Sequence, residues 1–124
     1  LQPISQAIKT HHPDLTAINI FSTPTPVDQL GEQATRDILL FLRLVKAQPR
    51  KNDKTGGTKM TALMEDDTGE IKVFFNDRKY IDYGAPMLDR GRVGTTLWAV
   101  KGSQPEGGGI IFCDMIRFLG EFKQ

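Results

Sequence analysis

The residues best suited to do chemistry are the positive charges of one segment, residues 43–59. This segment holds six cations and one acid, Asp53, so its local charge is +5, although the whole chain of 124 residues carries a formal net charge of only +1. The cations are Arg43, Lys46, Arg50, Lys51, Lys54 and Lys59. Such side chains can follow a phosphate backbone, so the segment predicts nucleic-acid binding. The alternative is a solvated loop without a function.

Aromatic side chains are the second candidate, because an exposed ring offers a stacking surface to an unpaired base. Phe74 follows Lys72 by two positions in an alternating segment, so both side chains are expected on one face of a strand. Trp98, and also Tyr80, are further candidates for such a ring. The alternative is that Phe74 and Trp98 pack under a helix. We predict a nucleic-acid site made of the six cations together with Lys72, Phe74 and Trp98.

Two groups of residues could instead hold a metal ion. Four carboxylates lie close together in Glu65-Asp66-Asp67 and Glu70, which is a composition that magnesium can use. Aspartates followed by Thr68-Gly69 are also typical of a tight turn, in which they accept backbone hydrogen bonds, and we expect the turn. His11 and His12 are adjacent and without acids or cysteines at ligand spacing, so we expect a solvated helix end and no metal site.

No catalytic pattern stands out. Cys113 lies in a strongly apolar run, which predicts a buried and inert thiol. The Gly-Gly-Thr-Lys sequence at residues 56–59 has the composition of a phosphate-binding loop but not its spacing. We therefore expect that the chain itself has no cofactor and no enzymatic activity. It is either no part of an enzyme or a non-catalytic domain of a larger one.

The composition describes a single domain of ordinary size. One cysteine excludes an internal disulfide and fits a reducing, intracellular setting such as the cytoplasm or the nucleoid. No run approaches the roughly 18 apolar residues that a membrane span needs, so no membrane partner is expected.

The elements that must position these residues are mainly strands. Apolar or alternating runs predict five strands at residues 38–45, 58–64, 70–75, 94–101 and 110–119, the first of them buried on both faces. Residues 48–57 and the glycine-rich residues 102–109 predict loops. Asn76 and Asp77 can cap a helix that begins near Arg78 and ends near Pro86. Residues 1–34 are expected to be an N-terminal extension with a short helix at 4–10 and an extended arm, residues 35–120 the domain, and residues 121–124 a tail.

The hairpin at the centre of this pattern resembles a known family. It carries Met60, Met64-Glu65-Asp66, Thr68-Gly69 and Ile71-Lys72-Val73. In these residues the chain resembles the OB-fold nucleic-acid-binding domain, in particular the OB domains of bacterial DNA polymerase III alpha subunits and the anticodon-binding domains of class II aminoacyl-tRNA synthetases. The resemblance spans roughly residues 35–119 and departs at Asn76, where relatives often have an apolar residue. It implies an all-β, five-stranded Greek-key barrel with one short helix between the third and fourth strands.

Two functions follow from this reading. The first is a non-catalytic module of a replication or repair protein that binds single-stranded nucleic acid. The likeness to the polymerase favours DNA, and the likeness to the synthetases favours RNA. The second is an assembly module without nucleic-acid binding, which would use apolar side chains such as Phe118, Leu119 and Phe122 to meet other replication proteins or a second copy.

Overall fold

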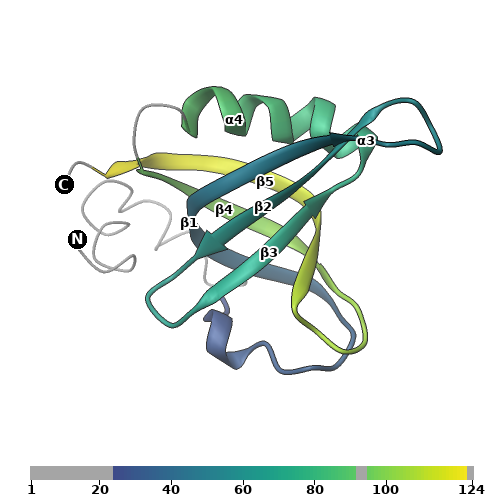
Figure 1. Cartoon of the computed structure of the whole chain (residues 1–124). Helices are drawn as coiled ribbons and strands as arrows, with labels where there is room; N and C mark the ends of the chain where they lie inside the picture. The colour runs from purple at the N-terminus through teal and green to yellow at the C-terminus, as the bar shows by residue number, and fades with distance from the viewer. Residues whose placement is uncertain (1–23, 92–94, 123–124) are drawn as a thin grey trace.

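Five strands form a sheet that closes on itself, as the ribbon shows (Figure 1). The computed structural model of the chain describes residues 24–91 and 95–122; the predicted helix at 4–10, the two histidines and the extended arm lie outside this part. The strands form a closed barrel in the order β1-β2-β3-β5-β4. They are β1 (Thr35–Lys51), β2 (Thr58–Glu65), β3 (Glu70–Phe75), β4 (Thr95–Gln104) and β5 (Ile110–Phe122). The prediction of a mainly β protein with five strands is confirmed.

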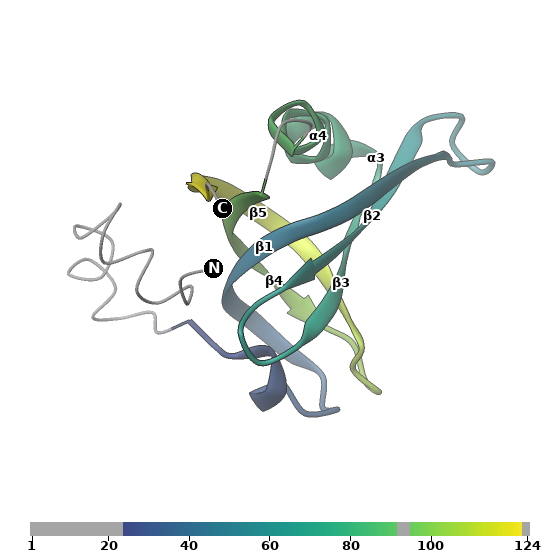
Figure 2. The same ribbon diagram turned by 60° about the vertical axis from the view of Figure 1, so that its left-hand side comes forward.

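The long strand β1 takes part in both halves of the barrel. Its first part pairs with β4 and its second part with β2, both antiparallel, and a β-bulge lies between Leu44 and Lys46. The β2–β3 and β4–β5 pairs are also antiparallel, whereas β3 and β5 run parallel. The curvature of the closed sheet is visible when the molecule is turned (Figure 2).

Strand β1 is longer than the sequence predicts, because it continues through Pro49 to Lys51. Pro49 lies opposite Met60 of β2. A proline is tolerated in a strand where its missing N–H is not needed for a ladder bond, and the pairings described for this part of β1 are all with β2 on one side. The predicted loop at residues 48–57 therefore shrinks to residues 52–57.

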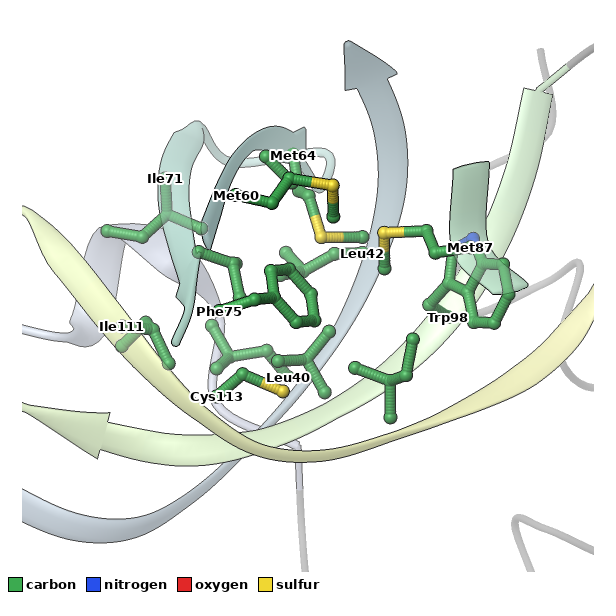
Figure 3. Close-up of a cluster of buried hydrophobic side chains, with 14 of the residues drawn as sticks. Leu40, Leu42, Met60, Met64, Ile71, Phe75, Met87, Trp98, Ile111 and Cys113 are labelled. Carbon is green, nitrogen blue, oxygen red and sulfur yellow. The ribbon is translucent and has the colours of Figure 1, made fainter. Parts of the chain in front are cut away.

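The alternation of the strands builds the core inside the barrel (Figure 3). Met60, Ala62 and Met64 of β2 are buried, as are the inward residues of the neighbouring strands. These residues are Ile38, Leu40, Leu42, Ile71, Val73, Phe75, Trp98, Val100, Ile111, Cys113 and Ile116. The prediction that the run at 38–45 is buried on both faces is wrong. Leu39 and Phe41 point away from the barrel interior and are only half-buried.

A helical segment joins β3 to β4 and lies over one end of the barrel (Figure 1). It consists of α3 (Asp77–Lys79), the π-helical stretch η2 (Tyr80–Gly84) and α4 (Ala85–Gly91). Asn76 caps it as predicted, since its Oδ1 accepts a hydrogen bond from the backbone N–H of Lys79 at 2.9 Å. Pro86 does not end the helix. The π-helical stretch just before it already departs from the α-helical bonding pattern, so a residue without an N–H costs less there.

The described part of the predicted N-terminal extension is bonded to the barrel. The backbone N–H of Thr25 donates to the carbonyl of Leu39 at 2.7 Å, and Val27 of the short helix η1 (Val27–Gln29) packs against the core. The Nε2 atom of buried Gln104 donates to the carbonyls of Leu30, Gly31 and Gln33 at 2.9–3.3 Å. No helix among residues 24–91 and 95–122 is long and apolar enough to span a membrane.

Candidate nucleic-acid interface

A groove with a volume of about 530 Å³ crosses the outer face of β1, β2 and β3. Four cations line it, and no carboxylate is among its lining residues. The lining residues are Lys46, Gln48, Arg50, Lys59, Met60, Thr61, Leu63, Lys72 and Phe74. Five of the nine residues predicted from the sequence are thus brought together, and they come from three different strands.

The pairing of the strands explains why these side chains share a face. Lys46 lies opposite Leu63, which lies opposite Lys72. Gln48, Thr61 and Phe74 form the next row across the three strands, and the Arg50–Lys59 pair forms the row after it. Side chains in such cross-strand rows are neighbours on one surface of the sheet.

The β-bulge at Val45 decides which side chains of β1 reach the groove. Before the bulge the even-numbered residues Leu40 and Leu42 point into the core. The bulge inserts one residue, so the following even-numbered residues Lys46, Gln48 and Arg50 point outward. A one-residue shift moves a strand's side chains to the opposite face. Without the bulge, the side chains of Lys46 and Arg50 would therefore be directed at the barrel interior.

One aromatic ring, Phe74, lines the groove, and a second, Phe112, lies next to it outside the lining residues. Phe74 is half-buried, and its ring meets the ring of Phe112 of β5 edge to face, with centroids 6.0 Å apart and planes at 85°. The parallel β3–β5 pairing places the two residues opposite each other. Phe112 is 44% exposed, so it still has surface to offer a ligand. Phe112 was not among the predicted residues, although its place between the inward Ile111 and Cys113 is the signal that could have shown it.

Arg43 belongs to the predicted site but has a structural role. Its side chain is buried, with Nη1 3.0 Å from Oδ1 of Asp67 and Nε 3.5 Å from Oε1 of Glu65. These ion pairs hold the β2–β3 turn against β1. Arg43 does not line the groove, so its prediction as a phosphate contact is wrong in this structure.

Trp98 is likewise not a surface ring. It is only 3% exposed, its Nε1–H donates to Oγ1 of Thr96 at 2.8 Å, and its ring packs against Phe118 with centroids 5.2 Å apart. The prediction of Trp98 as a stacking surface is wrong, because the alternation of β4 directs Thr96, Trp98 and Val100 into the core. Tyr80 also packs against the core.

Lys51 and Lys54 are exposed but do not line the groove. Lys51 lies opposite Thr58, one position beyond the Arg50–Lys59 pair, so its side chain is on the other face of the hairpin. Lys54 lies in the loop at residues 52–57. The predicted basic loop therefore divides between the groove and other surfaces.

The acidic cluster forms the expected turn. The Oδ1 atom of Asp66 accepts hydrogen bonds from the backbone N–H groups of Thr68 (2.7 Å) and Gly69 (3.0 Å), and Oδ2 accepts from the N–H of Val27 (2.8 Å). Partial burial acts to raise the pKa of Asp66, but the hydrogen bonds from Thr68, Val27 and Gly69 outweigh it, so the pKa lies below its usual value. No group of histidines, cysteines and acids within the described ranges could hold a metal ion.

Two further predictions concern apolar residues of β5. Burial raises the pKa of the Cys113 thiol to about 12, which fits the predicted inert thiol. Leu119 is buried, and the half-buried ring of Phe118 packs against Trp98 and lies 4.3 Å below the guanidinium carbon of Arg90. Leu119 therefore offers no surface to a partner, the predicted patch at Phe118 stays a prediction, and the side chain of Phe122 lies outside the described part.

Comparisons with known proteins found no match among protein-family models, curated proteins or solved structures.

Proposed function

We propose that the chain is a non-catalytic module that binds single-stranded nucleic acid in the groove over β1, β2 and β3, and that its barrel is an OB-fold. The strand order β1-β2-β3-β5-β4, the long shared β1, the parallel β3–β5 pair and the helical segment between β3 and β4 support the fold proposal. OB-folds bind oligonucleotides on the face of strands 2 and 3, which is where this groove lies.

One observation carries the proposal: four cations and the half-buried ring of Phe74 line a groove that has no lining carboxylate, and the exposed ring of Phe112 lies against Phe74. Lysine and arginine side chains would contact phosphates, and Phe74 with Phe112 would contact base faces. The bases of a duplex are stacked on one another and closed to such rings, so the arrangement favours an unpaired strand. Following the resemblance to the polymerase domains, we propose single-stranded DNA as the preferred ligand and replication or repair as the setting.

Fluorescence anisotropy with a labelled oligo-dT at two salt concentrations tests the proposal. Replacing Phe112 by Ala should weaken binding about 5- to 150-fold, which corresponds to the roughly 1–3 kcal/mol of one base–aromatic stack. Met115→Ala is the matched control, because Met115 is an exposed apolar residue of the same strand that lies opposite Lys101 of β4, whereas Phe112 lies opposite Phe74 of β3. Absence of binding at low salt would refute the proposal. An equal loss of affinity in both variants would show that the aromatic rings make no specific contact with the bases.

A protein-interaction module is the second candidate, and exposed apolar side chains outside the groove lining favour it. Ile81 is 72% exposed and Val45 is 46% exposed. A partner held by these side chains would co-purify in a salt-independent manner and would be lost in Ile81→Ser. Groove variants such as Lys72→Gln would leave that interaction unchanged.

A further inference from the structure

Half of the groove's cations lie on an arm that leaves the barrel. The last β2–β3 pair is Met60 with Phe75, so the Arg50–Lys59 and Lys51–Thr58 pairs lie beyond the part of β2 that β3 supports. The arm, residues 50–59, projects from the barrel body next to α3 (Figure 1). An isolated two-stranded ribbon is marginally stable in water, so the position of Arg50 and Lys59 depends on what holds the arm.

The carboxylate of Asp77 holds the tip of this arm. Its Oδ1 accepts a hydrogen bond from Nδ2 of Asn52 at 3.0 Å, and its Oδ2 accepts one from the hydroxyl of Thr55. Gly57 approaches so closely that a Cβ there would lie 2.7 Å from Oδ2. Asp77 is the first residue of α3, which Asn76 caps, so the arm is tied to a segment packed on the barrel.

Bonds within the tip make it a defined unit for Asp77 to hold. The N–H of Asn52 donates to the carbonyl of Gly57, and the N–H of Gly56 donates to the carbonyl of Asn52, both at 2.8 Å. The hydrogen bonds from Thr55 and Asn52, together with the charge of Lys59, lower the pKa of the Asp77 carboxyl. The acceptor is therefore ionised at neutral pH, where its hydrogen bonds are strongest.

We infer that Asp77 is a positioning residue that strengthens the binding of a polyanionic strand by fixing the arm that carries Arg50 and Lys59. This inference rests on the proposed function. It makes a prediction whose sign is opposite to that of simple electrostatics. A negative charge near a cationic groove repels nucleic acid, so by charge alone the loss of Asp77 would tighten binding. If Asp77 fixes the arm, its loss weakens binding, because the ligand must then order a mobile ribbon.

Two variants that remove the contact in different ways test the inference by oligo-dT anisotropy. Asp77→Ala removes the acceptor and a negative charge, whereas Thr55→Val removes one donor and leaves the charge unchanged. We expect both to weaken binding, Asp77→Ala by about three- to tenfold. The control is Asp82→Ala, which removes the same charge from the same helical segment, where Asp82 pairs with Arg78. The control should bind as tightly as the wild type or slightly tighter.

A double-mutant cycle separates positioning from general damage to the fold. Arg50→Ala should cost less in the Asp77→Ala background than in the wild type, because the arm is already free. Lys72→Ala should cost the same in both backgrounds, because β3 holds Lys72 between β2 and β5. Native-state hydrogen exchange gives a readout that is independent of binding, and the amide of Gly56 should exchange faster in Asp77→Ala.

The outcomes distinguish this inference from the proposed function. Wild-type binding combined with equal or tighter binding by Asp77→Ala overturns the inference and leaves the proposed function standing. Additive costs for Asp77 and Arg50 also overturn it. A wild type that fails to bind at low salt overturns the proposed function and this inference with it. If Asp77→Ala does not fold, Thr55→Val decides the matter, and unchanged affinity in that variant counts against the inference.

Discussion

The salt dependence of oligonucleotide binding should report the four groove cations. Binding to a single strand changes log K against log salt with a slope of about −0.7 for each phosphate that is neutralised. If Lys46, Arg50, Lys59 and Lys72 each contact one phosphate, the expected slope is about −2.8. Raising monovalent salt from 50 to 200 mM would then weaken binding about 50-fold.

A single charge-removing change makes this prediction specific. Lys72→Gln should reduce the slope to about −2.1, so the same rise in salt would weaken binding only about 18-fold. Lys101→Gln is the matched control, because Lys101 is an exposed lysine of β4 that does not line the groove. Anisotropy titrations with a labelled oligo-dT at five salt concentrations measure both slopes.

Two results would contradict this prediction. An unchanged slope in Lys72→Gln would mean that Lys72 contacts no phosphate. An equal reduction of the slope in Lys101→Gln would mean that net charge, and not the groove, determines binding.

Three further predictions concern residues that shape the site without contacting a ligand. Arg43→Ala should lower the free energy of unfolding by about 1–3 kcal/mol through lost packing and lost ion pairs, with nearly unchanged oligonucleotide affinity; urea denaturation and anisotropy measure the two effects. Gly102→Ala should lower the free energy of unfolding by about 1–3 kcal/mol, as measured by urea denaturation, because the added Cβ would lie 2.3 Å from the carbonyl oxygen of Phe112. Folding lowers the pKa of Asp66 from its ordinary value of 3.8, so the ionised carboxylate stabilises the fold at pH values above 3.8. This contribution is lost as the pH falls through the lower pKa of the folded state. The destabilisation by Asp66→Asn should therefore be larger at neutral pH than in acid, and urea denaturation across pH checks the sign.

Local patterns in the sequence correctly indicate much of the barrel. The alternation of residues 58–64 and 70–75 predicts which side chains of the hairpin are buried, because successive side chains of a strand face opposite sides. The Asp66–Gly69 turn and the Asn76 cap depend on hydrogen bonds within a few residues, so their sequences are sufficient to predict them.

Errors arise where the position of a residue depends on a distant strand. Pro49 reads as a loop residue, yet pairing with β2 carries the strand through it. Arginine and tryptophan are typical of nucleic-acid sites. Arg43 and Trp98, however, are buried, and their side chains bond to other residues of the barrel. The local alternation indicates only that Phe112 faces outward, and the parallel pairing of β3 and β5 is what brings it beside Phe74.

The strands, the central hairpin with its turn, and the concentration of positive charge in residues 43–59 can all be predicted from the sequence, since they depend on neighbours along the chain. Which of the charges share a surface follows only from the folded barrel. A single extra residue at Val45 turns Lys46 and Arg50 outward, and long-range bonds tie Asp77 to the tip of the arm that carries Arg50. The face to which a strand directs each side chain depends on its register with the neighbouring strands, and one inserted residue moves every following side chain to the opposite face.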